Sequence, residues 1–428
     1  MRGKRGTGMI YLAGSSALTG QTSYSVQRSI KEAHMRDVFL HTLKHENVTR
    51  AKLAKKLKLS GPAVSAIVDR EISAGYILEK QPMVSNAIGR PPILIEINGA
   101  FAVLPVVMLK RHGLACTVYD FALREKYSFF SPYSREFISG IDYGESAEGL
   151  KPISDEIFAG EISRLLRTGL NSGDMDKAAA VVFSFPGNID TVEETLDSVP
   201  MRIRFNVSAL SEVKHNCGEK PLLFGNDAMF SAYGEYALNP AHYENMIYID
   251  VGAGIGAGVV KSGDLLVDSH SFSFEIGHTT IDYNGPKCQC GNRGCLERYV
   301  NLNALVAEAR NRTESGEKSL ISDTDINIGT VAEAYDAGDT LVGEIMEKAA
   351  AKLVYGINNM VTLLSLRQVV IGGGIEKFGG KFLDLVNKKV GKLGNRRFMN
   401  RVTVSYAQFG PKCESYGAAS YFLEKYFI

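Results

Sequence analysis

Long apolar segments are missing from this sequence of 428 residues. No run of apolar residues approaches the roughly 18 that a helix needs to cross a bilayer, so we expect no membrane-spanning segment. The basic start of the chain, Met1 to Arg5, is followed only by a short apolar stretch at Met9 to Ala13, which Gly14 interrupts. A secretory signal peptide is therefore not expected, and the sequence predicts a cytoplasmic protein.

Cysteine is scarce, with six residues in the whole chain. Cys116, Cys217 and Cys413 lie far apart without a recognisable motif, and we interpret them as ordinary interior thiols. The other three cysteines lie close together, but a fourth is missing from this group, which argues against an iron–sulfur cluster. Neighbouring thiols can also pair as a disulfide in an oxidising compartment, so this alternative stays open.

A histidine just upstream favours a metal site over a disulfide. One imidazole and three thiolates make the ligand set of a single tetrahedral ion, and zinc is bound in this way where its role is structural. A closed set of four ligands leaves no position for water or substrate. We predict a structural Zn²⁺ in the loop 275–297, bound by His278, Cys288, Cys290 and Cys295.

Two carboxylates, Glu275 and Glu297, flank this loop. They cannot be ligands of an ion whose coordination is already complete, yet the folded loop would present both of them at one place. We therefore expect them to face a bound molecule rather than the metal.

Net charge is nearly absent, at +1, but it is unevenly distributed. Residues 1–95 hold 15 Lys and Arg against 6 Asp and Glu, a net charge of +9, which leaves −8 for the remainder. Such asymmetry is typical of a nucleic-acid-binding module joined to a part that does not bind nucleic acid. A merely solvated basic surface would give the same count, so the predicted elements have to decide.

Helical spacing of apolar residues predicts three helices in the basic segment. The first covers Val26 to His45, and the second covers Arg50 to Leu57 after a break at Asn47-Val-Thr49. Leu59-Ser-Gly-Pro62 turns the chain and caps a third helix, which ends at about Ala74 before Gly75.

Two short strands are predicted after these helices, at 76–80 and 93–97, with a turn at 85–89. Together the elements predict a winged helix-turn-helix domain at residues 25–98. Residues 1–24, rich in Gly, Ser and Thr, are expected to form a flexible tail.

In such a domain the third helix would enter the major groove of double-stranded DNA. The residues expected to meet base edges are the small ones at its start, Ser60, Gly61, Pro62, Ser65 and Ala66. The residues expected to meet phosphates lie on the second helix, namely Arg50, Lys52, Lys55 and Lys56. Arg90, between Gly89 and two prolines, could reach a minor groove or could be a surface residue of a linker.

Beyond residue 99, strands and helices alternate, which predicts an α/β architecture. Apolar runs that are typical of buried strands occur at Ala178–Phe185, Pro221–Phe224, Met246–Val251 and Gln368–Ile371. Glycine or a polar, turn-forming group follows each run, and ligands of α/β folds bind at the carboxyl ends of strands. One such loop is a weak signal, but four in one chain indicate a binding site.

Hydroxyl-rich ligands such as sugars are held by carboxylates and amides that make several hydrogen bonds at once. The residues that could form such a ring are Asn226, Asp227, Glu275, His278 and Glu297. Asp227 could also deprotonate a sugar hydroxyl for attack on a phosphate, if a nucleotide is held opposite it.

These residues resemble the ROK family (repressor, open reading frame, kinase), and the resemblance covers nearly the whole chain. It is carried by Asn47 to Ala54, Leu59 to Gly75, Gly89-Arg-Pro-Pro92 and the loop from Glu275 to Glu297. The resemblance implies a two-lobed, actin-like (ribonuclease H-like) sugar-kinase fold at residues 99–428. It also implies zinc at the four predicted ligands, sugar at the five ring residues and a homodimer or higher homo-oligomer.

The sequence departs from the kinases of this family at the first phosphate loop, Asp-x-Gly-x-Thr. Met108 aligns with the Asp and Lys110 with the Gly, and a thioether cannot hold magnesium. Ala253 and Met229 replace a Thr and an Asn that are common elsewhere in the family. Kinase activity is therefore predicted to be lost while the sugar ring is retained.

The resulting prediction is a transcription factor, specifically a repressor, whose affinity for an operator in double-stranded DNA changes when a sugar or sugar phosphate binds. Two alternatives stay open. One is an active sugar kinase that also binds DNA, and the other is a regulator with a disused pocket whose signal is a partner protein.

Overall fold

The computed structural model describes residues 9–11, 26–80, 92–140, 151–152, 154–171, 173–190, 195–198, 201, 203–206, 213–215, 217–267, 274–321, 325–394 and 396–427. No helix within these ranges is long and apolar enough to cross a membrane. The predicted turn at 85–89 and Arg90 lie outside the described residues.

The N-terminal unit, residues 26–97, contains three helices and a two-stranded antiparallel sheet. Its elements are α1 (Val26–Lys44), α2 (Arg50–Leu57), α3 (Gly61–Ala74), β2 (Ile77–Lys80) and β3 (Leu94–Ile97). The Thr49 side chain accepts a hydrogen bond from the Lys52 amide, and Ser60 caps α3 through the Ala63 amide. Gly75 ends α3 with a φ of 83°. These caps place the helices within a residue or two of the predicted bounds.

One buried carboxyl of the N-terminal unit has no compensating contact. Glu71 of α3 is 0% exposed, and within the described part of the chain neither of its carboxyl oxygens has a hydrogen-bond partner. Burial raises the pKa of Glu71 to about 8. The folded unit therefore favours the protonated form of this side chain.

The first sheet belongs to one lobe. Its edge strand comes from residues 9–11, which were expected to be part of a flexible tail. Its strands, in spatial order, are β1 (Met9–Tyr11), β12 (Leu222–Asn226), β8 (Val181–Phe185), β4 (Val103–Lys110), β5 (Gly113–Asp120) and β6 (Glu125–Pro132). Strands β1, β12, β8 and β4 run parallel, and β5 and β6 follow as antiparallel hairpins. Met9 to Tyr11 thus form an edge strand, because β12 offers them a free row of backbone groups.

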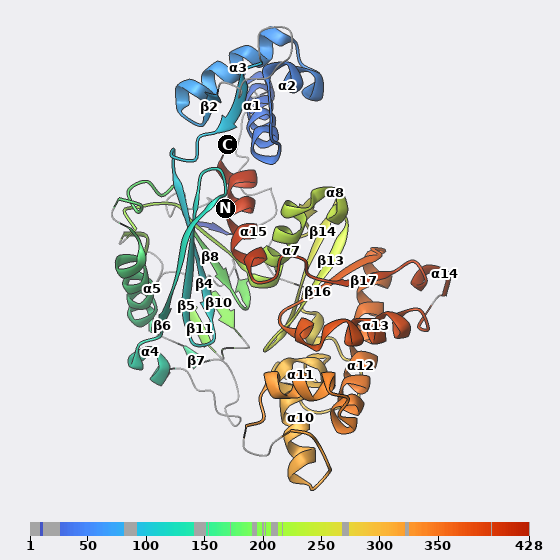
Figure 1. The fold of residues 1–428 in the computed structure, drawn as a ribbon. Coiled ribbons are helices and arrows are strands. Elements are labelled where there is room, and N and C mark those ends of the chain that lie inside the picture. The colour runs from blue at the N-terminus through green and yellow to red at the C-terminus, as the bar shows by residue number, and fades with distance from the viewer. Residues whose placement is uncertain are drawn as a thin grey trace.

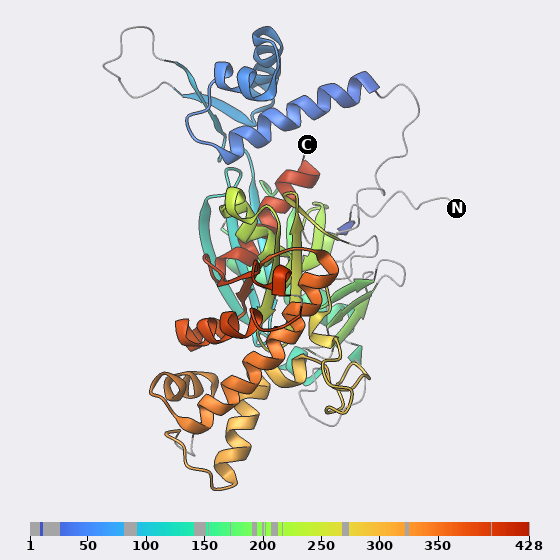
Figure 2. The ribbon, with the colours of Figure 1, turned by 90° about the vertical axis from the view of Figure 1, so that its right-hand side faces the viewer.

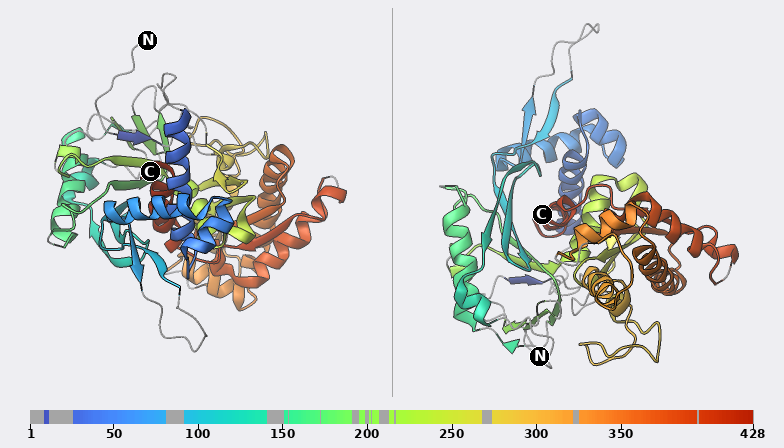
Figure 3. Two further views of the ribbon diagram at one scale, coloured as in Figure 1. Left: turned by 90° about the horizontal axis from the view of Figure 1, so that it is seen from above. Right: turned by 60° about the horizontal axis from the view of Figure 1, so that its bottom comes forward.

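The second sheet forms the other lobe. Its strands, in order, are β15 (Asp264–Leu265), β14 (Ile255–Lys261), β13 (Met246–Val251), β16 (Gln368–Gly372) and β17 (Thr403–Tyr406). Strands β13, β16 and β17 run parallel, so the loops after β13 and β16 lie at the same edge. Figure 3 shows the two lobes side by side, with helices on their outer faces.

Two helices lie between the sheets and join the lobes (Figure 1). Helix α7 (Asp227–Leu238) packs on β14 and β13, and α15 (Lys412–Phe422) packs on β4 and β8. The backbones of α7 and α15 touch, since a Cβ on Gly234 would lie 2.0 Å from the carbonyl oxygen of Cys413. A Cβ on Gly417 would likewise lie 1.9 Å from the carbonyl oxygen of Phe230. Glycine is required at both positions by this close approach.

The remaining elements cover the lobes and their loops. The outer helices are α5 (Asp155–Gly169), α10 (Leu302–Glu314), α11 (Ile328–Asp336), α12 (Thr340–Leu364) and α13 (Gly379–Val390). A small sheet contains β7 (Lys151–Pro152), β11 (Ile203–Asn206), β10 (Thr195–Ser198) and β9 (Asn188–Asp190). The short helices are α4 (Arg135–Gly140), α8 (Pro240–Tyr243), η1 (Ile276–His278), α9 (Glu297–Val300), η2 (Ile375–Phe378), α14 (Arg396–Met399) and η3 (Leu423–Phe427).

The N-terminal unit rests on the C-terminal end of α15 (Figure 2). Buried residues of α1, α2 and α3 share one continuous hydrophobic cluster with α7 and α15. The ring of Phe427 in η3 lies 5.9 Å from Phe39 of α1 and 5.3 Å from Tyr76, which follows α3. The unit is therefore packed against the helices that join the lobes rather than held by a linker alone.

Candidate functional site

A cavity of about 140 Å³ opens between the two lobes. It is lined by the ends of β8, β12 and β13, by the turn into β14 and by the cysteine loop. All five residues predicted to bind a sugar line it, namely Asn226, Asp227, Glu275, His278 and Glu297. The fold thus brings together side chains that are up to about 70 residues apart in the sequence.

One wall of the cavity is the start of α7. Asn226 ends β12 and caps α7, because its Oδ1 accepts a hydrogen bond from the Met229 amide at 3.1 Å. Its Nδ2 donates to the carbonyl of Gly187 at 3.0 Å. Asp227 is the first residue of α7, and its Oδ1 accepts from the Ala228 amide at 2.8 Å. Both side chains are therefore fixed by the strand end and the helix start.

Behind this wall lies an ion pair that the sequence did not predict. The Lys110 ammonium pairs with Glu414 in the first turn of α15, and Ser184 Oγ donates to the other Glu414 oxygen at 2.7 Å. Burial, then the charges of Glu414 and Asp250, raise the pKa of Asp227 well above its usual value, and Lys110 opposes this rise. Burial, then the charges of Glu414 and Glu376, raise the pKa of Asp250, the penultimate residue of β13, to about 6.

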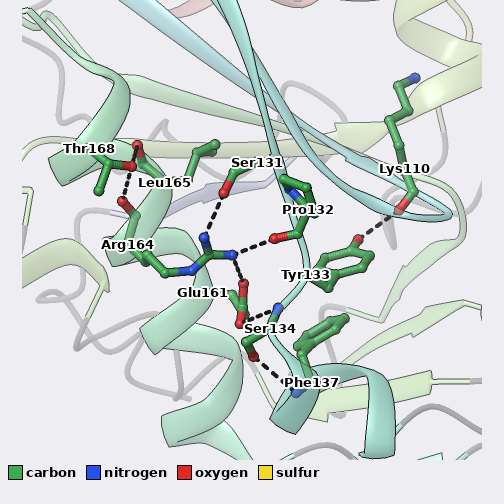
Figure 4. Close-up of polar contacts among 10 residues, drawn as sticks. All are labelled: Lys110, Ser131, Pro132, Tyr133, Ser134, Phe137, Glu161, Arg164, Leu165 and Thr168. Atoms are coloured by element: carbon green, nitrogen blue, oxygen red, sulfur yellow. Dashed lines mark hydrogen bonds and ion pairs between the residues drawn. The ribbon is translucent and has the colours of Figure 1, made fainter.

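The strand end that carries Lys110 is held by a polar network (Figure 4). The Tyr133 hydroxyl donates to the Lys110 carbonyl at 2.8 Å. The Arg164 guanidinium of α5 donates to Ser131 Oγ at 2.8 Å and to the Pro132 carbonyl at 2.6 Å. The turn after β4 is thereby tied to β6 and α5, which fixes where the Lys110 side chain begins.

The opposite wall of the cavity is the cysteine loop. Glu297 Oε2 accepts a hydrogen bond from the Ile255 amide at 2.9 Å, which joins the loop to the start of β14. Glu275 Oε2 lies 3.7 Å from His278 Nε2. The other ring nitrogen, Nδ1, lies 3.6 Å from Cys288 Sγ. His278 thus lines the cavity, with Nδ1 near Cys288 and Nε2 near Glu275.

The cysteine cluster fits a tetrahedral metal ion. The four ligand atoms of His278, Cys288, Cys290 and Cys295 lie within 4.8 Å of one another. Zn–S bonds of about 2.3 Å give a tetrahedron with edges of about 3.8 Å. The Cys290 and Cys295 sulfurs are 3.7 Å apart, which matches this edge and is far too long for a disulfide. A zinc ion held there would cross-link the loop, and none of its four positions would remain for chemistry.

The two residues that depart from the first phosphate loop of the kinases, Met108 and Lys110, both lie in β4. Met108 lies in β4 with only 7% of its surface exposed, between Ser184 and Ala115 on the neighbouring strands. A buried thioether in a sheet offers no oxygen ligand to magnesium. Lys110 ends the same strand, and its ammonium group is already paired with Glu414.

The residues predicted to contact DNA differ in their surroundings. Ser60, Gly61, Pro62 and Ala66 are exposed at the start of α3 and Ser65 is half-buried. Arg50 differs, because its guanidinium is bound within the unit, with NH2 at 2.7 Å from both Asp69 and Glu79 and NH1 at 3.2 Å from the Ser65 carbonyl. Lys52 donates to the Asn47 carbonyl at 2.9 Å. Arg50 therefore braces α2, α3 and β2 instead of extending toward a phosphate.

The sequence is similar to proteins of a known family. Residues 156–425 match the model of the ROK family. The chain belongs to the ROK family. A xylose repressor from Caldicellulosiruptor bescii is 25% identical over 356 residues, which cover 81% of this chain and 84% of that protein.

Solved structures of ROK proteins share the fold. A crystal structure of a ROK family transcriptional regulator, described as a homologue of the Escherichia coli Mlc protein, has a TM-score of 0.76 and 20% identity, and covers 92% of this chain and 96% of that one. A ROK glucokinase from Streptomyces griseus, solved with glucose and AMPPNP, has a TM-score of 0.60 and 22% identity, and covers 74% of this chain and 98% of that one. The glucokinase therefore aligns over about three quarters of the chain, whereas the regulator aligns over nearly all of it.

Sequence reasoning missed Asp250, Asp197 and the pair of Lys110 with Glu414. Asp250 could have been found, because it directly precedes a glycine-rich loop at the end of a predicted strand. No local signal marks the other residues, since Glu414 is separated from Lys110 by 304 positions.

Proposed function

We propose that this ROK protein is a sugar-responsive transcription regulator, and specifically a repressor acting in the cytoplasm. The observation that carries the proposal is the combination in one chain of a three-helix unit resembling a winged helix-turn-helix with a cavity lined by all five ring residues. The xylose repressor from C. bescii, which aligns over most of the chain, supports the same combination.

The regulator must connect the cavity to the N-terminal unit, and α15 with η3 provides a connection. At one end, Glu414 contacts Lys110 and Ser184, and its charge acts on Asp227 in the cavity. At the other end, Glu424 pairs with Lys44 of α1, and its carbonyl accepts from Arg36 at 2.6 Å. A sugar that alters the contacts of Glu414 can therefore alter how the helices of the N-terminal unit pack against η3.

Thermodynamic linkage sets the coupling free energy that this connection must supply. A sugar changes DNA affinity only if it prefers one arrangement of the lobes or of the N-terminal unit, and a 5- to 150-fold effect needs about 1–3 kcal/mol of coupling. The ion pair of Lys44 with Glu424 and the aromatic contacts of Phe427 are suited to this scale, because they can rearrange without unfolding the lobes. Zinc at the cysteine loop would hold Glu275 and Glu297 in place as the sugar binds.

The proposed DNA partner is a two-fold operator bound by a homodimer. Two copies of α3 would lie in major grooves about one or two helical turns apart, with Ser60, Gly61, Pro62 and Ala66 at the bases. Exposed lysines such as Lys55 and Lys56 would meet phosphates, while Arg50 supports α3 from within the unit.

The kinase alternative has one observation in its favour, which is Asp227 at the start of α7 with a raised pKa. A carboxylate of this kind can accept a proton from a sugar hydroxyl. The buried Met108 and the paired Lys110 at the end of β4 argue against a site for nucleotide phosphates and magnesium.

A binding experiment tests the proposal. We would select an operator from a random DNA library with the full chain, and then measure its affinity with and without a panel of hexoses, pentoses and N-acetyl sugars. The expected result is specific binding that at least one sugar changes by five-fold or more. Equal affinity with every sugar would contradict the proposal, and ATP-dependent phosphorylation of a sugar would establish the kinase instead.

A matched pair of variants locates the DNA contact. Ala66→Glu adds a negative charge on the exposed face of α3, and should abolish operator binding while leaving sugar binding intact. Ala307→Glu adds the same charge to an exposed position of α10 and should leave both unchanged. Loss of operator binding in both variants would count against α3 as the reading element.

A further inference from the structure

We propose that the effector of this cavity is an uncharged sugar and that the cavity rejects sugar phosphates. The inference deepens the proposed function and rests on it. It is carried by the charges that line the cavity and by the contacts that already engage the nearby cations and backbone amides.

The charge of the cavity wall has one sign. The carboxylates that line it are Asp197, Asp227, Asp250, Glu275 and Glu297. Among the described residues that line the cavity there is no lysine or arginine. His278 is the remaining basic group, and as a zinc ligand it would be neutral. The negative charges of neighbouring carboxylates already help to raise the pKa of Asp227 and Asp250. A dianionic phosphate placed in this cavity would add further charge of the same sign.

Two cations beside the cavity, Lys110 and Arg204, are held by carboxylates of the protein. Lys110 pairs with Glu414, whose side chain is 9% exposed and also accepts the hydrogen bond of Ser184. Arg204 donates through Nε to Asp197 at 2.6 Å. A phosphate could recruit Lys110 only by separating it from the Glu414 carboxylate, which would then be left buried without its partner.

In the glycine-rich turn between β13 and β14, some of the backbone amides that could bind a phosphate already donate hydrogen bonds within the protein. The Ile255 amide donates to Glu297 at 2.9 Å, and the Gly252 amide donates to the Gly254 carbonyl at 2.9 Å. The carboxylate of Glu297 thus accepts the hydrogen bond of a backbone amide that an anionic ligand would otherwise need. A neutral sugar has no such conflict, because its hydroxyl groups can donate to the carboxylates that remain.

The experiment compares ligands that differ in charge but keep the same sugar ring. Isothermal titration of the full-length, zinc-loaded protein would use D-glucose, D-mannose and N-acetyl-D-glucosamine, each with its 6-phosphate. For the tightest-binding sugar, a neutral 6-O-acetyl ester and a singly charged 6-sulfate separate charge from size. We expect the phosphate to bind roughly 10- to 100-fold more weakly than its parent sugar, with the sulfate between them and the acetyl ester close to the parent.

Salt and one variant test the electrostatic cause. Raising the salt concentration screens the repulsion, so the ratio between parent sugar and phosphate should shrink. Asp250→Asn removes one carboxylate charge and should shrink the ratio by several-fold. Asp336→Asn removes the same charge from an exposed position at the end of α11 and should leave the ratio unchanged.

The outcomes separate this inference from the function on which it rests. Tighter binding of a sugar phosphate than of its parent would overturn the inference and leave the sugar-responsive regulator intact. An equal loss of affinity with the acetyl ester, or a ratio that salt does not change, would overturn the electrostatic cause. Binding of no sugar in either form would overturn both this inference and the proposed function.

Discussion

The N-terminal unit and the cavity are built in different ways. In the unit, the residues that fix each helix lie within a few positions of one another, as Thr49 and Ser60 show at the starts of α2 and α3. At the cavity, Asp227 and Asp250 of the wall and Lys110 and Glu414 behind it come from distant parts of the chain and share one electrostatic environment. The unit can therefore vary without disturbing the cavity, except where η3 joins the two.

The largest expected effect lies at the cysteine loop and should spare the N-terminal unit. Cys290→Ser removes one of the four predicted ligands, and the zinc content should fall from one ion per chain to near zero because structural sites need a closed set. Sugar binding should be lost with it, while the operator should still bind. Elemental analysis measures the metal, and Cys217→Ser, outside the cluster, should retain zinc. Unchanged zinc in the first variant would refute the ligand assignment.

The next effect lies inside the N-terminal unit and concerns Glu71. Its pKa is about 8 in the folded unit and near 4.5 when unfolded, so the stability it contributes is fully present below pH 4.5 and lost as the pH rises through 8. Glu71→Gln should remove this loss and raise stability at pH 8.5 by on the order of a few kcal/mol relative to the wild type.

Calorimetry at pH 5 and pH 8.5 checks this prediction. The gap in unfolding temperature between Glu71→Gln and the wild type should widen toward the higher pH. Glu46→Gln, on an exposed residue of the same unit, should show no such widening. A gap that stays constant with pH would mean that the folded unit does not favour the protonated form of Glu71.

A smaller effect separates sugar sensing from DNA binding. Glu275→Gln keeps the shape of the cavity but weakens the acceptor that a sugar hydroxyl would meet, so sugar affinity should fall by about 2 kcal/mol, or roughly 30-fold. Operator affinity without sugar should not change. Titration calorimetry and DNA-binding anisotropy measure the two quantities, and Glu333→Gln, at an exposed position of α11, is the control. Normal sugar affinity would remove Glu275 from the site.

The smallest effect concerns the contact between the two regions. Lys44→Gln breaks the pair with Glu424, so the ratio of operator affinities with and without sugar should fall several-fold while sugar affinity itself is kept. Lys318→Gln removes an exposed charge far from η3 and should keep the full ratio. An unchanged ratio in Lys44→Gln would show that the coupling takes another route.

How much the sequence predicts depends on how local the signals are. The helices of the N-terminal unit are encoded in short stretches, so their bounds were predicted closely. The four residues predicted to bind zinc also lie in a short stretch, and the fold brings their ligand atoms within 4.8 Å of one another. The edge strand Met9 to Tyr11 was not, because three residues gain a strand only where β12 offers backbone partners. Arg50 was predicted to meet phosphates from its position on α2, and its ion pairs with Asp69 and Glu79 were not predicted, because these residues are neighbours in space but not in sequence.

By itself, the sequence determined the cysteine and histidine spacing of the predicted metal site and the caps of α2 and α3. These features follow from short-range chemistry, because the residues involved lie close together in the chain. The five residues predicted to bind a sugar were named from the sequence, but it is the fold that brings them to one cavity. Only the tertiary structure decided that Glu414 meets Lys110 beside Asp227, and that η3 meets α1 through Glu424 and Lys44. Charges act through space rather than along the chain, so the full set of charged groups around the cavity depends on how the two lobes are arranged.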